Sequence, residues 1–290
     1  MAQPTSIQST FDRSWQVREE AHYNHWIRQK PRNQIQLAFR RHWLTFGRYL
    51  NNLPGNEVLE VGCGRGTIGS YFADAGYRVT LLDSSPAVLS IARKIYRANR
   101  HGAHYVAGDA FSLPFSNDRF AACVSIGLLE HFDDIGAVMA EQLRVLRPNG
   151  VMLAYVVPER PDSVQRHFHW LNRLLGRCSR LFSVREAASS AVKAPLYRNG
   201  LTAAAYLSAL DARGVTAREA CGMYPLPMIS HSPEFPFSLL PDWLERGLVT
   251  IFSGVLMLRR ALFGKDPWTC KEHIGQAFLV VARKPTSPSQ

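Results

Sequence analysis

The chain has 290 residues, of which 46% are hydrophobic and 20% are charged, with 17 prolines and 20 glycines. This composition is that of a globular protein with a substantial core, and it excludes disordered, collagen-like and disulfide-scaffold classes. The five cysteines are scattered without a Cys-x-x-Cys pair for a zinc or redox site, and the first ten residues lack a secretory signal, so we expect a cytoplasmic protein.

The formal net charge of +11 is unevenly distributed along the chain. The basic excess lies mainly in residues 1–55 and 158–200, whereas residues 56–157 are almost balanced. A basic surface suits an acidic substrate, nucleic acid or anionic lipid. Most of the basic residues are arginine, however, and genomic base composition alone can produce that bias. The charge by itself therefore does not select a partner.

Residues 1–55 are expected to form an N-terminal helical cap. Apolar residues recur at helical spacing from Ile35 to Leu53, and Pro54–Gly55 ends the stripe.

Residues 56–157 alternate between apolar runs and helical periodicities, which is the pattern of an α/β protein with a mainly parallel sheet. Ser85 is placed to cap a helix that begins at Pro86, and Pro148–Asn149–Gly150 is expected to halt a later helix. The expected strands are 57–61, 78–82, 103–107, 120–126 and 151–157, and the expected helices are about 68–75, 86–99 and 135–146.

The alternation resumes near residue 202 with a helix over 202–213 and strands over 215–223 and 276–283. Residues 158–200 and 224–275 are too long for ordinary connections, so we expect insertions that form a substrate lid on one domain spanning residues 56–290. Aromatic residues of the second insertion could wall an apolar pocket or form an accessory core: Tyr224, Phe235, Phe237, Trp243, Phe252 and Trp268.

Residues 242–263 form the strongest amphipathic stretch of the chain. Such a stripe ordinarily packs on a core. It is too short to span a bilayer, because only residues 247–258 lie between Arg246 and Arg259, well below the roughly 20 needed. Peripheral contact with a membrane surface remains open as an alternative. The stripe consists of Leu244, Leu248, Ile251, Val255, Leu258 and Leu262.

A glycine-rich loop, Gly62-Cys63-Gly64-Arg65-Gly66, follows the first expected strand and opens a helix. Glycine there lets the backbone approach a ligand closely, while the helix N–H groups face it. Gly64, Gly66 and Gly69 also satisfy the G-x-G-x-x-G dinucleotide fingerprint, so an NAD-dependent oxidoreductase must be considered. The loop alone does not decide the cofactor.

Four segments together carry a more specific signal: VLEVGCGRGTIG at 58–69, LLDSS at 81–85, GDAFSLPF at 108–115 and CVSIGLLEHF at 123–132. Their order and spacing resemble the motifs of class I S-adenosylmethionine-dependent methyltransferases, in the small-molecule branch similar to types 11 and 25. The resemblance covers residues 55–158 and implies a Rossmann-like seven-stranded sheet of order 3-2-1-4-5-7-6 with the last strand antiparallel. It also implies S-adenosyl-L-methionine as cofactor.

The resemblance implies roles for individual residues. Gly62 and Gly64 would let the loop contact the methionine portion of the cofactor, Asp83 would accept from both ribose hydroxyls, and Asp109 from the adenine amino group. The Ala110 N–H would serve a ring nitrogen. The physics agrees for Asp83, because an ionised carboxylate is acceptor-only and can receive two vicinal hydroxyls. The expected cofactor-binding set is Glu60, Gly62, Cys63, Gly64, Asp83, Ser84, Asp109, Ala110 and Ile126.

His131 is the candidate catalytic residue, because it follows the fourth strand near the expected methyl position. An imidazole can act as a base for a hydroxyl acceptor, although a histidine in the Leu-Glu-His run can also only pack or orient.

The acceptor class is less defined. The run SIGLLE at 125–130 lacks the Asn/Asp-Pro-Pro-aromatic motif of many nucleic-acid amino-methyltransferases, which argues against DNA or RNA as the substrate. We expect methyl transfer to oxygen, nitrogen or carbon of a small, apolar or aromatic acceptor, with no obligate partner. The rival prediction is a membrane-surface methyltransferase of a lipid or quinone precursor.

Overall fold

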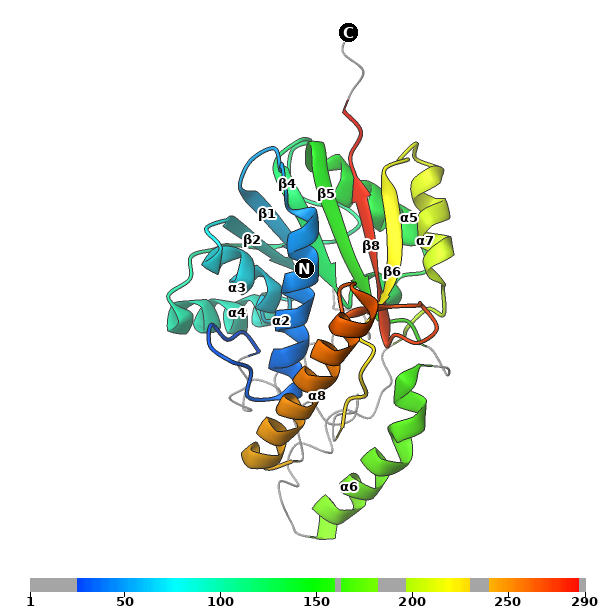
Figure 1. Cartoon of the computed structure of the whole chain (residues 1–290). Coiled ribbons are helices and arrows are strands. Elements are labelled where there is room, and N and C mark those ends of the chain that lie inside the picture. The colour runs from blue at the N-terminus through cyan, green and yellow to red at the C-terminus, as the bar shows by residue number, and fades with distance from the viewer. Residues whose placement is uncertain (1–24, 160–162, 182–196, 230–239, 287–290) are drawn as a thin grey trace.

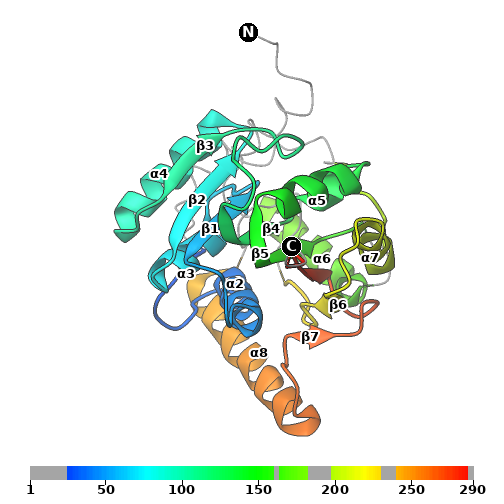
Figure 2. The same ribbon diagram turned by 90° about the horizontal axis from the view of Figure 1, so that it is seen from above.

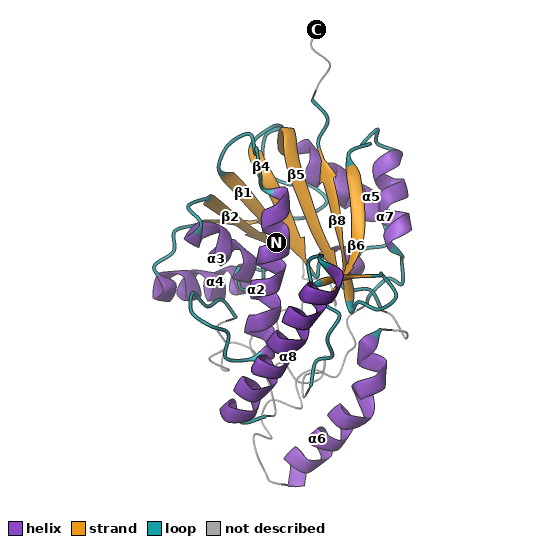
Figure 3. Cartoon of the chain, in the orientation of Figure 1, coloured by secondary structure: helices purple, strands orange, loops and turns teal. Residues whose placement is uncertain are grey.

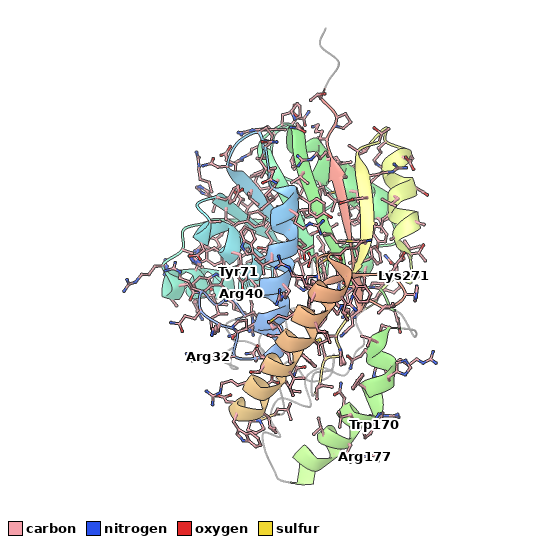
Figure 4. All side chains as sticks on the ribbon, viewed as in Figure 1. Arg32, Arg40, Tyr71, Trp170, Arg177 and Lys271 are labelled. Carbon is pink, nitrogen blue, oxygen red and sulfur yellow. The ribbon has the colours of Figure 1, made fainter. Side chains whose placement is uncertain are left out.

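The computed structural model describes residues 25–159, 163–181, 197–229 and 240–286. These residues form one mixed sheet with helices on both faces (Figures 1 and 3). The strands are β1 (Glu57–Val61), β2 (Arg78–Asp83), β3 (His104–Ala107), β4 (Phe120–Ile126), β5 (Leu146–Val156), β6 (Arg218–Met223), β7 (Thr269–Cys270) and β8 (Ala277–Arg283). The α-helices are α2 (Gln34–Phe46), α3 (Thr67–Asp74), α4 (Pro86–Asn99), α5 (Ile135–Arg144), α6 (His169–Leu181), α7 (Ala203–Asp211) and α8 (Asp242–Phe263). Short 3-10 helices are η1 (Gly47–Tyr49), η2 (Leu129–His131) and η3 (Val164–Phe168).

The strand order is β3-β2-β1-β4-β5-β8-β6-β7. Strands β1 to β5 pair in parallel, and β8 lies antiparallel between β5 and β6. The predicted order is therefore confirmed, with the two-residue β7 added at the edge beside β6. The chain moves from β1 to β2 and β3 on one side, and to β4 and β5 on the other. Strand order reverses at β1, where ligands of open α/β sheets collect.

Alternate residues of the central strands enter two separate cores. Val58 and Val124 belong to the core under α2, α3, α4 and α8, whereas Leu59 and Cys123 belong to the core under α5 and α7. All four side chains are fully buried. Because both faces of the sheet are covered, the strands appear in the sequence as nearly continuous apolar runs.

Several element boundaries differ from the sequence-based expectation. The helix expected to extend to Leu53 ends as α2 at Phe46 and is followed only by η1.

Leu146 belongs to β5 and not to the preceding helix, which ends at Arg144, because Leu146 pairs with Phe120 in the parallel ladder. Pro148–Asn149–Gly150 therefore lies inside β5 and does not halt that helix. Strand β6 begins at Arg218 instead of Val215, whose N–H closes the end of α7 by donating to the Leu210 carbonyl.

The two insertions supply α6 and α8. Helix α6 lies beyond the carboxyl ends of the parallel strands, at the lower edge of the sheet in Figure 1. Helix α8 lies outside α2, and Figure 2 shows it as the outermost element on that face. Within the described ranges, no helix is both long enough and apolar enough to cross a bilayer.

The aromatic residues of the second insertion mostly form an accessory core. Tyr224, Phe252 and Trp268 are buried in the cluster that also contains residues of α2 and the sheet. Tyr224 and Trp268 pack against each other with ring centroids 4.6 Å apart. These three residues therefore do not wall a pocket, and Phe235 and Phe237 lie outside the described residues.

Candidate functional site

The glycine loop between β1 and α3 has a shape that only glycine adopts readily. Gly62, Gly64 and Gly66 have φ angles of +64°, +52° and +65°. A Cβ atom on Gly66 would lie 2.7 Å from the Tyr96 ring, and the Tyr96 hydroxyl donates to the Gly66 carbonyl at 2.9 Å. The loop is therefore held closely against α4, with the amino end of α3 directed to the carboxyl edge of the sheet.

Glu60 lies behind this loop and fixes it to α3. Its side chain is buried, and Oε2 accepts a hydrogen bond from the Gly69 N–H at 2.8 Å. Burial raises the pKa of Glu60 to about 8; the Gly69 N–H opposes this shift and the neighbouring Asp83 adds to it. Glu60 is therefore mainly protonated at neutral pH. Its contacts place it as a support of the loop.

Asp83, at the end of β2, is oriented by two backbone donors. Its Oδ2 accepts from the Gly64 N–H at 3.0 Å, and its Oδ1 accepts from the Ser85 N–H at 3.1 Å. An ionised carboxylate is acceptor-only and has about four acceptor positions, so Asp83 is suited to receive several donors. Ser84 is exposed beside it, and Ser85 caps α4 as predicted, accepting from the Val88 N–H.

Asp109 follows β3 on the neighbouring loop. Its Oδ1 accepts from the Phe111 N–H at 3.0 Å, and the preceding Gly108 N–H donates to the Asp83 backbone carbonyl at 3.1 Å. The two acidic residues are thus joined through the backbone. Ala110 is buried next to the exposed Asp109.

The exit of β4 carries His131 in η2, just beyond Ile126. Its Nδ1 lies 2.6 Å from the Tyr197 carbonyl oxygen. Because a carbonyl only accepts, Nδ1 carries the proton and Nε2 is the basic nitrogen of the neutral ring. Burial lowers the pKa of His131, which the Tyr197 contact partly opposes. This shift favours the neutral ring that a general base requires.

Sequence reasoning missed Glu130 and Asn199. Glu130 is 1% exposed, and burial raises its pKa to about 7. The Asn199 N–H donates to the Glu130 carbonyl at 2.7 Å, and the Asn199 side-chain amide donates to the carbonyls of Leu129 and Phe132 at 3.2 and 2.9 Å. The end of the first insertion is thus anchored on the β4 exit. The only sequence signal was an acid within an apolar run and an Asn-Gly pair.

The carboxyl ends of β1, β2, β3 and β4, which are neighbours in the sheet, bring all of the predicted site residues to one edge. Hydrogen bonds join the glycine loop, Asp83 and Gly108 directly. The edge combines a positive-φ loop, a helix amino terminus and two oriented carboxylates. This donor and acceptor set fits a nucleoside-containing ligand with two vicinal hydroxyls and an exocyclic amine.

Comparison with known proteins gives the following similarities. Residues 58–150 match the sequence model of the family described as "Methyltransferase domain". The malonyl-[acyl-carrier protein] O-methyltransferase of Serratia marcescens is 36% identical over 100 residues, which cover 34% of this chain and 38% of that protein. The demethylmenaquinone methyltransferase of Renibacterium salmoninarum is 36% identical over 102 residues, covering 35% and 41%. The chain therefore matches only about two fifths of the length of these relatives.

A solved structure resembles the whole chain. A chain in the complex between the Haloferax volcanii Trm112 methyltransferase activator and the putative methyltransferase has a TM-score of 0.55 and 21% identity, covering 98% of this chain and 100% of that chain. At this level of identity, the likeness concerns the fold alone.

Proposed function

We propose that this chain, which belongs to the class I S-adenosylmethionine-dependent methyltransferase family by its match over residues 58–150, transfers a methyl group to a small-molecule acceptor. The observation that carries the proposal is the Asp83 carboxylate, oriented by Gly64 and Ser85 and placed beside Asp109 at the carboxyl edge. The family match favours S-adenosylmethionine over the nicotinamide cofactor that the glycine spacing left open.

The bound cofactor would supply an electrophilic methyl group on a sulfonium, so the protein mainly aligns the acceptor and excludes water. Asp83 would accept hydrogen bonds from the two ribose hydroxyls, and Asp109 from the adenine amino group. The Ala110 N–H would serve a ring nitrogen. The positive φ angles of Gly62 and Gly64 support a close approach of the loop to the methionine portion.

The other predicted residues would act around these contacts. Glu60 and Cys63 are buried and would hold the loop in shape, since the Cys63 N–H donates to the Leu82 carbonyl at 3.0 Å. Ser84 is exposed beside Asp83, and Ile126 is half-buried at the end of β4. Both would flank the cofactor.

For the acceptor, we propose a small, largely apolar molecule methylated on oxygen, nitrogen or carbon. The position of α6 beyond the carboxyl edge supports a lid made from the insertions (Figure 1). The two relatives named above act, by their names, on a malonyl-[acyl-carrier protein] and on demethylmenaquinone, neither of which is a nucleic acid. For a hydroxyl acceptor, the neutral His131 ring would serve as the base.

Calorimetric titration with S-adenosylmethionine, S-adenosylhomocysteine and NAD tests the cofactor. We expect binding of the first two and none of NAD. Binding of NAD without a response to S-adenosylhomocysteine would contradict the proposal. The acceptor is tested by following methyl label from the cofactor into a soluble metabolite extract and a lipid extract, with nucleic acid as a third substrate. Label found only in nucleic acid would contradict the small-molecule assignment.

A further inference from the structure

Helix α8 turns an apolar face to solvent. Its exposed side chains include Trp243, Ile251, Met257, Leu258, Leu262 and Phe263, which are between 59% and 70% exposed. The expectation that the amphipathic stripe packs on a core is therefore wrong for Ile251, Val255, Leu258 and Leu262. Figure 2 shows α8 as a ridge on the outside of the molecule, with no described element over it. Exposed apolar patches of this kind mark interaction sites.

The opposite face of α8 fixes the orientation of the helix. Val249, Phe252 and Leu256 are buried against the sheet side. Near the start of α8, the buried Glu245 carboxylate accepts from the Gln34 backbone N–H at 3.1 Å and from the Gln34 side-chain amide at 3.2 Å. The helix is thus attached firmly through one face, and the apolar face cannot turn inward without breaking these contacts.

Two basic side chains lie at the edge of the apolar face or just beyond the helix. Arg246 is exposed one helical turn from Trp243, and Lys265 is exposed just after α8. Arg259 is held by the carbonyls of Pro267 and Thr269 at 3.2 and 3.3 Å. An apolar face with a tryptophan near one end and cationic residues at its edge has the composition of a helix that lies in the plane of a membrane interface.

We propose that α8 docks the protein on the surface of an anionic phospholipid bilayer. Trp243, Ile251, Leu258 and Leu262 would enter the boundary between headgroups and acyl chains, and Arg246 and Lys265 would contact lipid phosphates. The overall charge of +11 favours the same partner. This docking goes beyond the methyl-transfer proposal and does not depend on it.

A second copy of the chain is the competing occupant, and the charges disfavour it. In a parallel pair of α8 helices, Arg246 of one copy would lie beside Arg246 of the other. In any arrangement, two chains that each carry a formal net charge of +11 would be brought together. An anionic surface neutralises these same residues.

The test is co-sedimentation of the full chain with vesicles of phosphatidylcholine alone or of phosphatidylcholine with phosphatidylserine, at low and high salt. We expect binding to the anionic vesicles that weakens with salt. The double variant Ile251→Ser/Leu258→Ser should bind at least about tenfold more weakly, because two large aliphatic side chains no longer enter the interface. Arg246→Gln/Lys265→Gln should lose about fivefold in binding per charge removed on anionic vesicles.

Leu44→Ser is the matched control, since Leu44 is an exposed leucine of α2, outside α8. It should bind vesicles like the unmodified chain. Thermal melting and titration with S-adenosylhomocysteine verify that each variant is folded; failure of the unmodified chain to bind that nucleoside would count against methyl transfer but not against docking. The docking proposal is overturned by absence of vesicle binding, by wild-type binding of Ile251→Ser/Leu258→Ser, or by a concentration-dependent dimer that this variant disperses.

Discussion

Asp83 is oriented by the backbone before any ligand arrives, so little reorganisation is needed when hydroxyl groups reach it. Asp83→Ala removes the acceptor and leaves the Gly64 and Ser85 N–H groups without their partner. We expect the affinity for S-adenosylhomocysteine to fall by about 1.5–3 kcal/mol for each charge-assisted hydrogen bond lost. Calorimetry measures this directly.

Asp118→Ala is the control for that measurement, because Asp118 is an exposed acid whose carboxylate pairs with Lys284 at 2.8 Å, away from the site edge. It should leave the affinity unchanged. Equal affinities of Asp83→Ala and the unmodified chain would remove Asp83 from the cofactor site.

Glu60 makes the stability of the fold depend on pH. Burial raises its folded pKa from 4.5 to about 8, so between these values the folded state holds a proton that the unfolded state has lost. The free energy of unfolding therefore falls as pH rises through this interval. Glu60→Gln cannot titrate and keeps an oxygen for the Gly69 N–H. Its stability relative to the unmodified chain should rise from about pH 5 to about pH 8, as measured by urea unfolding.

A constant difference between the two proteins across that range would show that Glu60 does not titrate as described. Burial also raises the pKa of Glu130 to about 7. Glu130 therefore adds the same pH dependence to the stability of both proteins, and its contribution cancels in the comparison.

At the scale of single residues, the sequence identifies candidate site residues where a local motif requires one residue type. Asp83 and Gly64 could be chosen as candidates because Asp83 ends one strand and Gly64 follows another at the spacing of a motif. Asn199 was not, because its role comes from carbonyls of Leu129 and Phe132, about 70 residues earlier in the chain. No local pattern records such a contact.

The turn from β1 into α3 depends on close packing as well as on backbone freedom. Gly66 has φ +65°, and an added Cβ would lie 2.7 Å from the Tyr96 ring and 2.8 Å from the Leu81 side chain. Gly66→Ala should therefore lower the free energy of unfolding by about 1–3 kcal/mol more than backbone strain alone would. Chemical denaturation measures the difference.

Gly76→Ala separates the two effects. Gly76 also has a positive φ, +88°, but an added Cβ would meet nothing within 4 Å. Gly76→Ala should therefore lose only the stability that backbone strain costs, with no loss from a steric clash. If both variants lost the same stability, the contact with Tyr96 would not matter.

Helix α8 shows which features of a secondary-structure element hydrophobic periodicity can predict. The pattern predicted the bounds of the helix and an apolar stripe, but the packed face is the one containing Glu245 and Phe252. Periodicity does not say which of two apolar arcs meets the core. Gln34, 211 positions away in the sequence, decides which face is buried, because it donates a hydrogen bond to the buried Glu245 carboxylate.

Over the whole molecule, the described cysteines are free and embedded in the fold. Cys63 and Cys123 are buried, and burial raises the pKa of both thiols; it raises the pKa of Cys221 to about 12 and that of Cys270 to about 11. Because the thiolate is the reactive form, we expect slow alkylation of these four residues at neutral pH in the native state and rapid alkylation in denaturant. Peptide mass spectrometry after iodoacetamide treatment locates the label.

Rapid native labelling of Cys63 or Cys123 would indicate that the sheet opens more readily than the packing implies. The control is any cysteine-containing unfolded peptide in the same reaction, which fixes the intrinsic rate.

The global architecture was largely predictable because alternating strands and helices permit few topologies. The insertion of β8 between β5 and β6 came from the family resemblance and not from periodicity. The two-residue β7 was invisible, since a bridge with Gly222 and Met223 needs no sequence pattern of its own.

The position of β8 also governs how the chain is made. Strand β5 ends at Val156, but its antiparallel neighbour begins at Ala277. At about 5–20 residues per second, a ribosome takes on the order of ten seconds to synthesise what lies between them. During that interval β5 is an open sheet edge on a nascent polypeptide, able to pair with other strands. The β5 edge is therefore available for pairing with other chains throughout this interval, until β8 has emerged from the exit tunnel.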